Sequence, residues 1–400
     1  MKIQREKLII LATVFIDVLG IGIIIPVLPF YLESFGANAF MLTSLFSVFS
    51  LCSFLSAPVL GALSDKIGRR PVLLLSIFST AIGWFVFASA GKIWVLFLGR
   101  IIDGIAAGNF PIAQSYLSDL SKDEKDRTAN FGTIGAIFGI AFIVGPVFGS
   151  LLSSVSPAFP FWFAGGLAAA NFIGAIFFLP ETHNDRKKDV KISFNPLAPL
   201  GRALQEKILR SRYAAWFFFG LAGSMLQAIF ALYVGEQFGI KTSLIGFIFA
   251  GMGILMSFNQ GILMKRFWLK KFKESSLEIW LFLFFAGAFL LMGINNLYLF
   301  ALGMVINVFS QSVLRVVISS RVAGIAGHLR RGEVLGVMSS VLSAAMIIGP
   351  LIAGIVFEAH HSLPFIFGAL ALLAAFLVMK LSAEPKQIEP EPETIVPEAL

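Results

Sequence analysis

The sequence predicts an all-α membrane protein with twelve transmembrane helices. Its 400 residues have a mean hydropathy of +0.86, 57% of them are hydrophobic and 43 are Phe. A water-soluble globule of this length cannot bury so many apolar side chains, so lipid must cover part of the surface. Apolar runs long enough to cross a bilayer, which takes about 20 residues per helix, recur from Leu8 to Ser382. These runs are continuous rather than alternating, which favours helices over a β-barrel.

Each predicted helix corresponds to one apolar run, and charged residues fall mainly in the gaps between runs. The first six runs lie between the basic N-terminal residues and a polar segment that begins at Glu181: residues 8–31, 39–62, 71–91, 93–118, 128–153 and 160–180. The other six lie between that segment and a tail rich in Glu and Pro: residues 213–235, 242–264, 275–295, 297–319, 333–357 and 363–382. The first run contains Asp17 and lacks a small-residue cleavage pattern, so we expect a retained helix rather than a signal peptide.

The chain is predicted to form two similar six-helix bundles. We expect bundles at residues 1–180 and 213–382, a cytoplasmic linker at 181–212 and a disordered cytoplasmic tail at 383–400. An internal repeat at a single offset of 204 residues supports this division: Leu98-Gly99 aligns with Leu302-Gly303, Arg127 with Arg331, Gly132 with Gly336, and Gly145-Pro146 with Gly349-Pro350. Two such halves packed face to face would enclose a cavity and expose it alternately to each side of the membrane.

The distribution of Lys and Arg predicts that both termini are cytoplasmic. Of the 31 Lys and Arg residues, 27 lie at the termini or in every second gap, whereas the opposite gaps hold only Lys92 and Lys241. Positive residues in short loops are retained in the cytoplasm during insertion. The same bias accounts for the net charge of +8, so we expect the lipid bilayer as a partner and no nucleic acid.

Catalytic and metal-binding patterns are missing from the sequence. It contains no H-E-x-x-H, G-x-S-x-G or Cys/His set, so we expect neither an enzyme nor a metal site nor a cofactor.

Several motifs make the chain resemble a known family over essentially its whole length. They are Asp17 to Gly22 with Pro26 and Pro29, the loop Gly61 to Arg70, Leu98-Gly99-Arg100 with Gly104, Gly135 through Gly145-Pro146 to Gly149, and Leu179 to His183. With these motifs the chain resembles the major facilitator superfamily, and within it the twelve-span drug/proton antiporters that include the tetracycline exporters. The resemblance implies the two-bundle fold of that superfamily and export in exchange for protons.

The loop Gly61 to Arg70 is predicted to be part of a conformational switch. Gly61 and Gly68 would let helix ends approach closely, Asp65 would lie near a helix N-terminus, and Arg69 would pair with Asp119 at the end of span 93–118. Such contacts would close the cytoplasmic side and break when it opens. The complete set of predicted switch residues is Gly61, Asp65, Gly68, Arg69, Arg70, Asp119, Gly145, Pro146 and Gly149. Alternatively, the basic residues of the loop only enforce topology.

The Gly-Pro segment of span 128–153 has a second interpretation. Its glycines remove side chains from the helix surface, and Pro146 frees a backbone carbonyl, which fits close helix packing. The resemblance further implies antiport, since this segment is characteristic of antiporters in the superfamily.

Four charged residues are predicted to lie deep inside spans: Asp17, Arg100, Asp103 and Arg315. A charge at the membrane centre costs about 2.5 to 3.5 kcal/mol on insertion scales and is rarely kept without a function. Burial favours a protonated acid and a nearby guanidinium favours the carboxylate, so an Asp that moves relative to an Arg can carry protons. We predict proton coupling at Asp17, Asp103 and Arg100, although Asp103 could instead form a static intrahelical pair with Arg100.

Substrate contacts are predicted from the polar residues inside the spans. Asn307, Gln311 and Arg315 form a stripe at four-residue spacing that could face the cavity, although Arg315 could also extend to the membrane interface. The complete set of predicted substrate-binding residues is Asp17, Arg100, Gln227, Asn307, Gln311 and Arg315. Leu255 to Phe258 contain no His and Leu283 to Ala286 no Asp, unlike the tetracycline exporters, which argues against tetracycline itself.

The sequence therefore predicts a proton-coupled exporter of drug-like amphipathic or organic-acid small molecules, with protons as the coupling ion. The alternative is an uptake symporter or facilitator for a carboxylate-bearing metabolite or siderophore, because fold does not fix direction. We expect a monomer in the bacterial inner (plasma) membrane.

Overall fold

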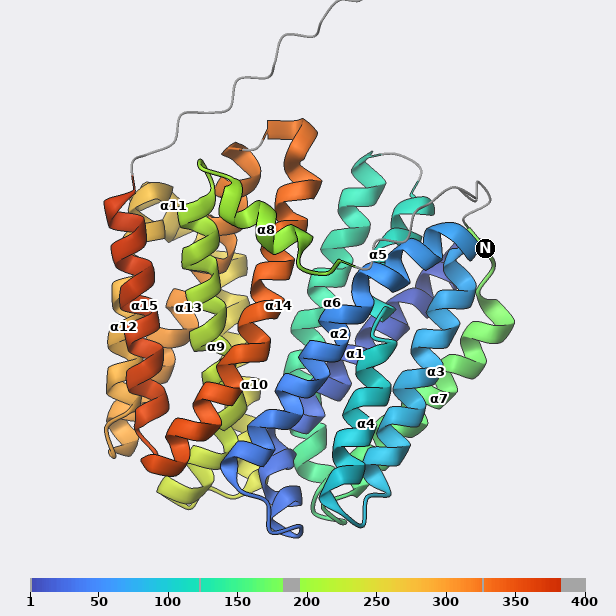
Figure 1. Cartoon of the computed structure of the whole chain (residues 1–400), viewed down its shortest axis with the longest axis horizontal. Coiled ribbons are helices and arrows are strands. Elements are labelled where there is room, and N and C mark those ends of the chain that lie inside the picture. The colour runs from blue at the N-terminus through green and yellow to red at the C-terminus, as the bar shows by residue number, and fades with distance from the viewer. Residues whose placement is uncertain (1, 122–123, 183–194, 326, 383–400) are drawn as a thin grey trace, which may run out of the picture.

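The chain is almost entirely helical in the residues that the structure describes. A computed structural model describes residues 2–121, 124–182, 195–325 and 327–382, and it contains no strand in these ranges (Figure 1). The helices of the first half are α1 (Lys2–Glu33), α2 (Ala39–Ile67), α3 (Arg69–Ala88), α4 (Ile93–Ile105), α5 (Asn109–Asp119), α6 (Glu124–Leu152) and α7 (Phe159–Phe178). Those that follow are α8 (Ala198–Gln205), α9 (Arg210–Phe238), α10 (Thr242–Phe258), the π-helix η1 (Asn259–Trp268), α11 (Leu269–Lys271), α12 (Glu274–Met292), α13 (Leu297–Ile325), α14 (Gly327–Ala359) and α15 (Leu363–Leu381).

The prediction of an all-helical membrane protein is confirmed. Ten helical segments in the described ranges are long and apolar enough to cross a membrane. The two other predicted spans correspond to α4 with α5, and to α6, whose described apolar part, Gly139–Leu152, is shorter. Of the predicted linker and tail, residues 183–194 and 383–400 lie outside the described residues. The described part of the linker contains the short helix α8, which was not predicted.

The predicted span 93–118 is not one continuous helix, and this detail of the prediction was wrong. Helix α4 ends at Ile105 and α5 begins at Asn109. Pro111 has no backbone N–H, so the carbonyl of Ala107 cannot receive the helical hydrogen bond that would carry the helix through this point. Gly104 also lies against α2, where an added Cβ would come within 2.6 Å of the Cys52 Cβ. The break therefore lies directly beside α2, in the interior of the first half.

Buried apolar side chains form two separate clusters, one in each half of the chain. One cluster contains residues between Ile10 and Leu179, and the other contains residues between Ala203 and Met379. The internal repeat is visible in the packing of both. A Cβ added at Gly145 would lie 2.9 Å from the Leu19 carbonyl oxygen of α1, and one added at Gly349 would lie 3.0 Å from the Leu221 carbonyl oxygen of α9. The same close helix contact thus occurs in both halves.

The two halves meet along two helix pairs, α2 with α14 and α6 with α10 (Figure 1). A Cβ added at Gly354 of α14 would lie 2.8 Å from the Cα of Phe40 in α2. The backbone N–H of Phe40 donates to the Glu358 carboxylate of α14 over 3.1 Å. The start of α2 and the end of α14, which make these contacts, lie at the end of the molecule opposite the N-terminus (Figure 1).

Candidate functional site

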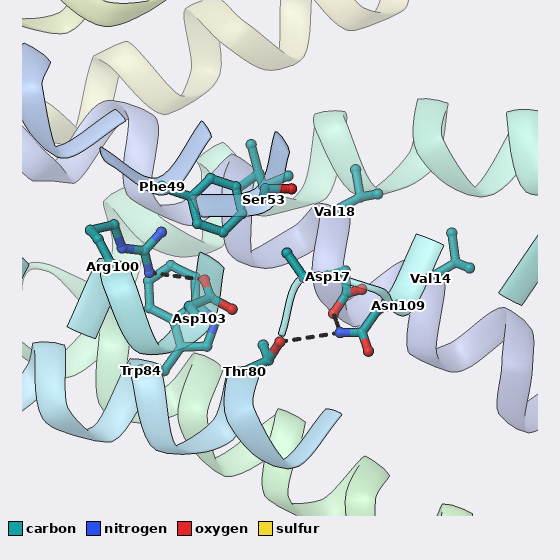
Figure 2. A pocket seen from close by; sticks show the side chains of 12 residues that line it. Val14, Asp17, Val18, Phe49, Ser53, Thr80, Trp84, Arg100, Asp103 and Asn109 are labelled. Carbon is teal, nitrogen blue, oxygen red and sulfur yellow. Dashed lines mark hydrogen bonds and ion pairs between the residues drawn. The ribbon is translucent and has the colours of Figure 1, made fainter. Parts of the chain in front are cut away.

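A polar cavity lies within the first half of the chain. It measures about 160 Å³ and is lined by side chains of α1, α2, α3, α4 and α5, together with Ala107 between the last two (Figure 2). Three of the predicted deep charges, Asp17, Arg100 and Asp103, line this cavity. The remainder of the wall is mainly apolar and aromatic, with Phe49 and Trp84 among the lining residues. The structure therefore brings together the residues that were predicted to couple protons.

Asp17 is held by a hydrogen bond from a residue that the sequence analysis missed. Asn109 Nδ2 donates to Asp17 Oδ1 over 2.8 Å and to Thr80 Oγ1 over 3.1 Å (Figure 2). Asn109 is the first residue of α5, so the helix break places its side chain in the cavity. Placing a neutral Asn side chain inside the membrane costs less free energy than placing a charged one, so its presence in an apolar run is a weaker indication of function. The only sequence signal was a polar residue between Gly108 and Pro111 inside an apolar run.

Arg100 and Asp103 form a buried ion pair beside Asp17. Arg100 Nη2 lies 3.3 Å from Asp103 Oδ2, and the two residues are only 5% and 6% exposed. The guanidinium lies 4.4 Å from the Trp84 ring centroid and 5.1 Å from that of Phe87, which stabilises its charge by cation–π interaction. Its Nε and Nη2 atoms have no hydrogen-bond partner in the described part of the chain. The ion pair is thus present, but it leaves donors of Arg100 without a hydrogen bond.

A second, smaller cavity lies between the two halves. It measures about 70 Å³ and is lined by residues of α1, α2 and α4 on one side and of α9 and α14 on the other. Arg100 lines both cavities, so the polar cavity of the first half adjoins the space between the halves. Gln227, predicted to contact substrate, lies in this second cavity with Ser224 and Met346. Apolar surface with a few polar groups suits a small amphipathic ligand.

The predicted polar stripe of α13 does not line either cavity. Asn307 is buried in the second half, with its Oδ1 atom unpartnered. Gln311 lies against α9, where its Nε2 atom would be 3.5 Å from a Cβ added at Gly223. The Arg315 side chain is exposed rather than buried. These three residues therefore do not form one continuous face toward the cavities.

The predicted contacts of the loop after α2 are largely present. Arg69 Nη1 lies 2.5 Å from Asp65 Oδ1, and Arg69 Nε lies 3.3 Å from Asp119 Oδ2, which links the ends of α2, α3 and α5. Gly61 was predicted to let helix ends approach closely, and this was wrong, because no atom lies within 4 Å of a Cβ added there. Gly68 does need to be Gly, since its φ of +114° lies in a region that side chains disfavour.

Glu181 occupies the position that was predicted for Asp65. Its carboxylate accepts hydrogen bonds from the backbone N–H groups of Arg69, at 2.9 Å, and Arg70, at 3.2 Å, at the N-terminus of α3. A Cβ at Gly68 would overlap this carboxylate. Asp65 lies in the last turn of α2 instead and pairs with Arg69. Arg70 also reaches the Ile176 carbonyl oxygen over 2.8 Å, so the loop is fastened to α7.

The Gly-Pro segment of α6 lies between α1 and α10. A Cβ added at Gly149 would lie 2.8 Å from the Ile23 carbonyl oxygen of α1. On the other side, the Pro146 carbonyl oxygen and Ser150 contact Gly246 of α10. Small residues thus allow α6 to pack closely both within its own half and against the other half.

A buried ion triad in the second half was also missed. Glu278 is 1% exposed and accepts from Arg212 at 2.8 and 3.0 Å, and its Oε2 atom lies 3.0 Å from Arg321 Nε. The three residues join the start of α9, the start of α12 and the end of α13. Their position near predicted span ends made them look like ordinary interfacial charges.

Comparison with known proteins agrees with this architecture. Residues 10–274 and 267–398 match the family model of the Major Facilitator Superfamily. The chain is 30% identical over 404 residues to the tetracycline resistance protein, class E, of Escherichia coli, with 97% of each chain covered. It is 29% identical over 381 residues to the quinolone resistance protein NorA of Staphylococcus aureus, covering 94% of this chain and 96% of the relative.

A solved structure shares the fold. The human organic anion transporter MFSD10 (TETRAN) has a TM-score of 0.70 at 24% identity, with 95% of this chain and 100% of that chain covered. The helices, the repeated packing of the two halves and the family match lead to one assignment. The chain belongs to the Major Facilitator Superfamily and is an integral membrane transporter rather than an enzyme.

Proposed function

We propose that this transporter is a proton-coupled exporter of drug-like amphipathic small molecules. The observation that carries the proposal is the position of Asp17. Its carboxylate is held by Asn109 in a cavity that also contains the Arg100–Asp103 pair and adjoins the space between the halves. The names of the resistance proteins to which the chain is similar support export of such compounds.

The charge of the cavity supports exchange rather than cotransport. Asp17, Asp103 and Arg100 carry a net charge of −1 when all three are ionised. A proton neutralises this charge, and so does a cationic group of a substrate, so the two compete for the same site. A purely anionic substrate would instead bind better after protonation, which would couple its movement to protons in the same direction. Competition at Asp17 therefore favours antiport of molecules with a cationic or hydrogen-bond-donating group.

We propose that transport proceeds by alternating access. The halves are packed together at the end opposite the N-terminus, which we assign to the outer side because the positive residues lie at the other end. This structure then represents the inward-facing state with both termini in the cytoplasm. Opening to the outside would separate α10 from the Gly-Pro segment of α6 and α14 from the start of α2. The Asp65–Arg69–Asp119 contacts are formed in this inward-facing structure and join α2, α3 and α5 of the first half, so we propose that they keep this half rigid during the step rather than close the inner side.

The proton gradient is large enough for this task. One proton moving inward down about 100 mV releases about 2.3 kcal/mol, and a tenfold concentration ratio requires about 1.4 kcal/mol. One proton per substrate would thus sustain a gradient of some tens of fold. We propose a monomer in the bacterial cytoplasmic membrane that needs no cofactor, with protons, substrate and lipid as its partners.

Everted membrane vesicles energised by respiration would test the proposal. A fluorescent acid-sensitive dye reports the stored protons, and a quinolone and a tetracycline serve as test compounds. We expect at least one compound to release protons from vesicles that contain the wild-type protein, and Asp17→Asn to abolish the release. Glu33→Gln is a matched control, because it makes the same chemical change at an exposed position on the same helix.

Three outcomes would contradict the proposal. Proton release by Asp17→Asn at the wild-type rate would exclude Asp17 as the proton carrier. Substrate movement without any proton release would indicate a facilitator. Proton movement in the same direction as the substrate would indicate a symporter.

A further inference from the structure

Arg315 is a charged residue in the middle of α13 that lacks a partner. It lies ten residues before Ile325, about 15 Å along the helix axis from that end. In the described part of the chain it makes no hydrogen bond or ion pair. By contrast, Arg100, Arg212 and Arg321 each pair with a carboxylate. An unpaired guanidinium at such a depth is costly, which makes a function for it the default hypothesis.

The direction of Arg315 follows from its neighbours on the helix. Gln311 lies against Gly223 of α9, whereas Ser312 accepts a 2.6 Å hydrogen bond from Asn259 Nδ2 of η1. Arg315 comes four positions after Gln311 and three positions after Ser312. Since successive side chains of an α-helix are rotated by about 100°, the side chain of Arg315 leaves the helix in a direction between those of Gln311 and Ser312. The guanidinium therefore extends into the space between α9 and η1.

This space is not the lipid-facing side of α13. The exposed apolar residues Leu302, Val305 and Val316 lie on another face of the helix, which is the face that suits lipid. Arg315 is accessible and yet surrounded by protein on most sides, as expected for a residue in a hollow of the protein. Helix α9, on one side of it, also contributes Ser224 and Gln227 to the cavity between the halves. The side chain of Arg315 is therefore directed toward the side of α9, the helix that supplies polar residues of the second half to that cavity.

We propose that Arg315 binds an acidic group of the transported molecule, such as a carboxylate, enolate or phenolate oxygen. A guanidinium presents paired donors that match a carboxylate. Since Asp17 lies on the first half, the two halves offer charges of opposite sign. The substrate class is then an amphipathic molecule with both a cationic or hydrogen-bond-donating group and an acidic oxygen. This inference rests on the proposed function, because it describes a second contact of the same substrate.

The test measures ligand binding to the purified full chain in detergent without a proton gradient. The probes are 2-naphthoate and its methyl ester, which differ in one negative charge. The readout is the ligand concentration that gives half of the maximal shift in melting temperature. We expect naphthoate to reach this point at an about tenfold lower concentration than the ester, the size expected for a hydrogen-bonded charge. Arg315→Gln should remove the preference and leave the ester curve unchanged.

Two further variants make the result specific. Lys380→Gln removes a positive charge that lies over the Phe376 ring of α15, and it should keep the full preference. Arg315→Lys keeps the charge without the paired donors and should keep part of the preference, and it replaces Arg315→Gln if that variant does not fold.

The proposal is overturned if the wild-type protein responds equally to both probes, or to neither. It is also overturned if Arg315→Gln retains the preference, which would be the result if Arg315 only pairs with an acid of the first half in another state. Failure of the proposed proton-coupled export can be told apart from failure of this inference. If only the export proposal fails, vesicles show no coupled proton release, but the preference for naphthoate, which is measured without a gradient, persists.

Discussion

Replacing Gly145 by Ala tests whether the close packing of α1 against α6 depends on the missing side chain. The added Cβ would lie 2.9 Å from both the Leu19 carbonyl oxygen and the Gly22 Cα. Ordinary contacts between carbon atoms are about 3.5 to 4.0 Å long, so the helices would have to separate by about 0.6 to 1 Å. Both contacting atoms belong to the backbone, so no side-chain rotation can relieve the overlap.

The magnitude follows from two opposing terms. Overpacking of this kind costs about 1 to 3 kcal/mol. Replacing a helical Gly by Ala gains about 0.8 to 1 kcal/mol of helix propensity. We therefore expect Gly145→Ala to destabilise the protein by up to about 2 kcal/mol, and by about 1 to 3 kcal/mol relative to a helical Gly→Ala variant that gains the propensity without an overlap.

Gly139→Ala is the matched control, because nothing lies within 4 Å of a Cβ added at this position of the same helix. It gains the same propensity without an overlap and should be neutral or stabilising. The assay is thermal unfolding of the purified variants, together with substrate-driven proton release in vesicles. We expect Gly145→Ala to lower the melting temperature and slow transport, because Asp17 lies on α1 next to the displaced segment. Equal melting temperatures for the two variants would refute the packing argument.

Two further predictions concern residues that the sequence analysis missed. Glu278→Gln should destabilise the protein by about 3 to 5 kcal/mol, because it leaves two guanidinium groups without their buried carboxylate, and an unchanged melting temperature would contradict this. Asn109→Leu removes the 2.8 Å hydrogen bond to Asp17 and should slow substrate-driven proton release about tenfold or more at an unchanged melting temperature. Wild-type release rates in that variant would mean that Asn109 does not position Asp17.

The sequence alone determined the membrane class and the approximate position of each span. Lipid imposes this pattern locally, since each span needs its own apolar length and its own backbone hydrogen bonds. The deep charges Asp17, Arg100 and Asp103 were also recognisable, because a charge inside an apolar run has a cost that is visible in the sequence. The sequence predicted a cavity between the two halves, whereas the structure places all three charges on the wall of a cavity within the first half.

Only the tertiary structure decided which partners these residues have. Asn109 and Thr80 are neutral, so nothing in the sequence marked them as neighbours of Asp17. Glu181 reaches the start of α3 from more than a hundred positions away, whereas the local candidate, Asp65, pairs elsewhere. Hydropathy acts on each segment separately, but hydrogen bonds and ion pairs depend on distances between helices. Those distances are fixed by the packing of small residues such as Gly145 and Gly149, and they exist only once the helices have assembled.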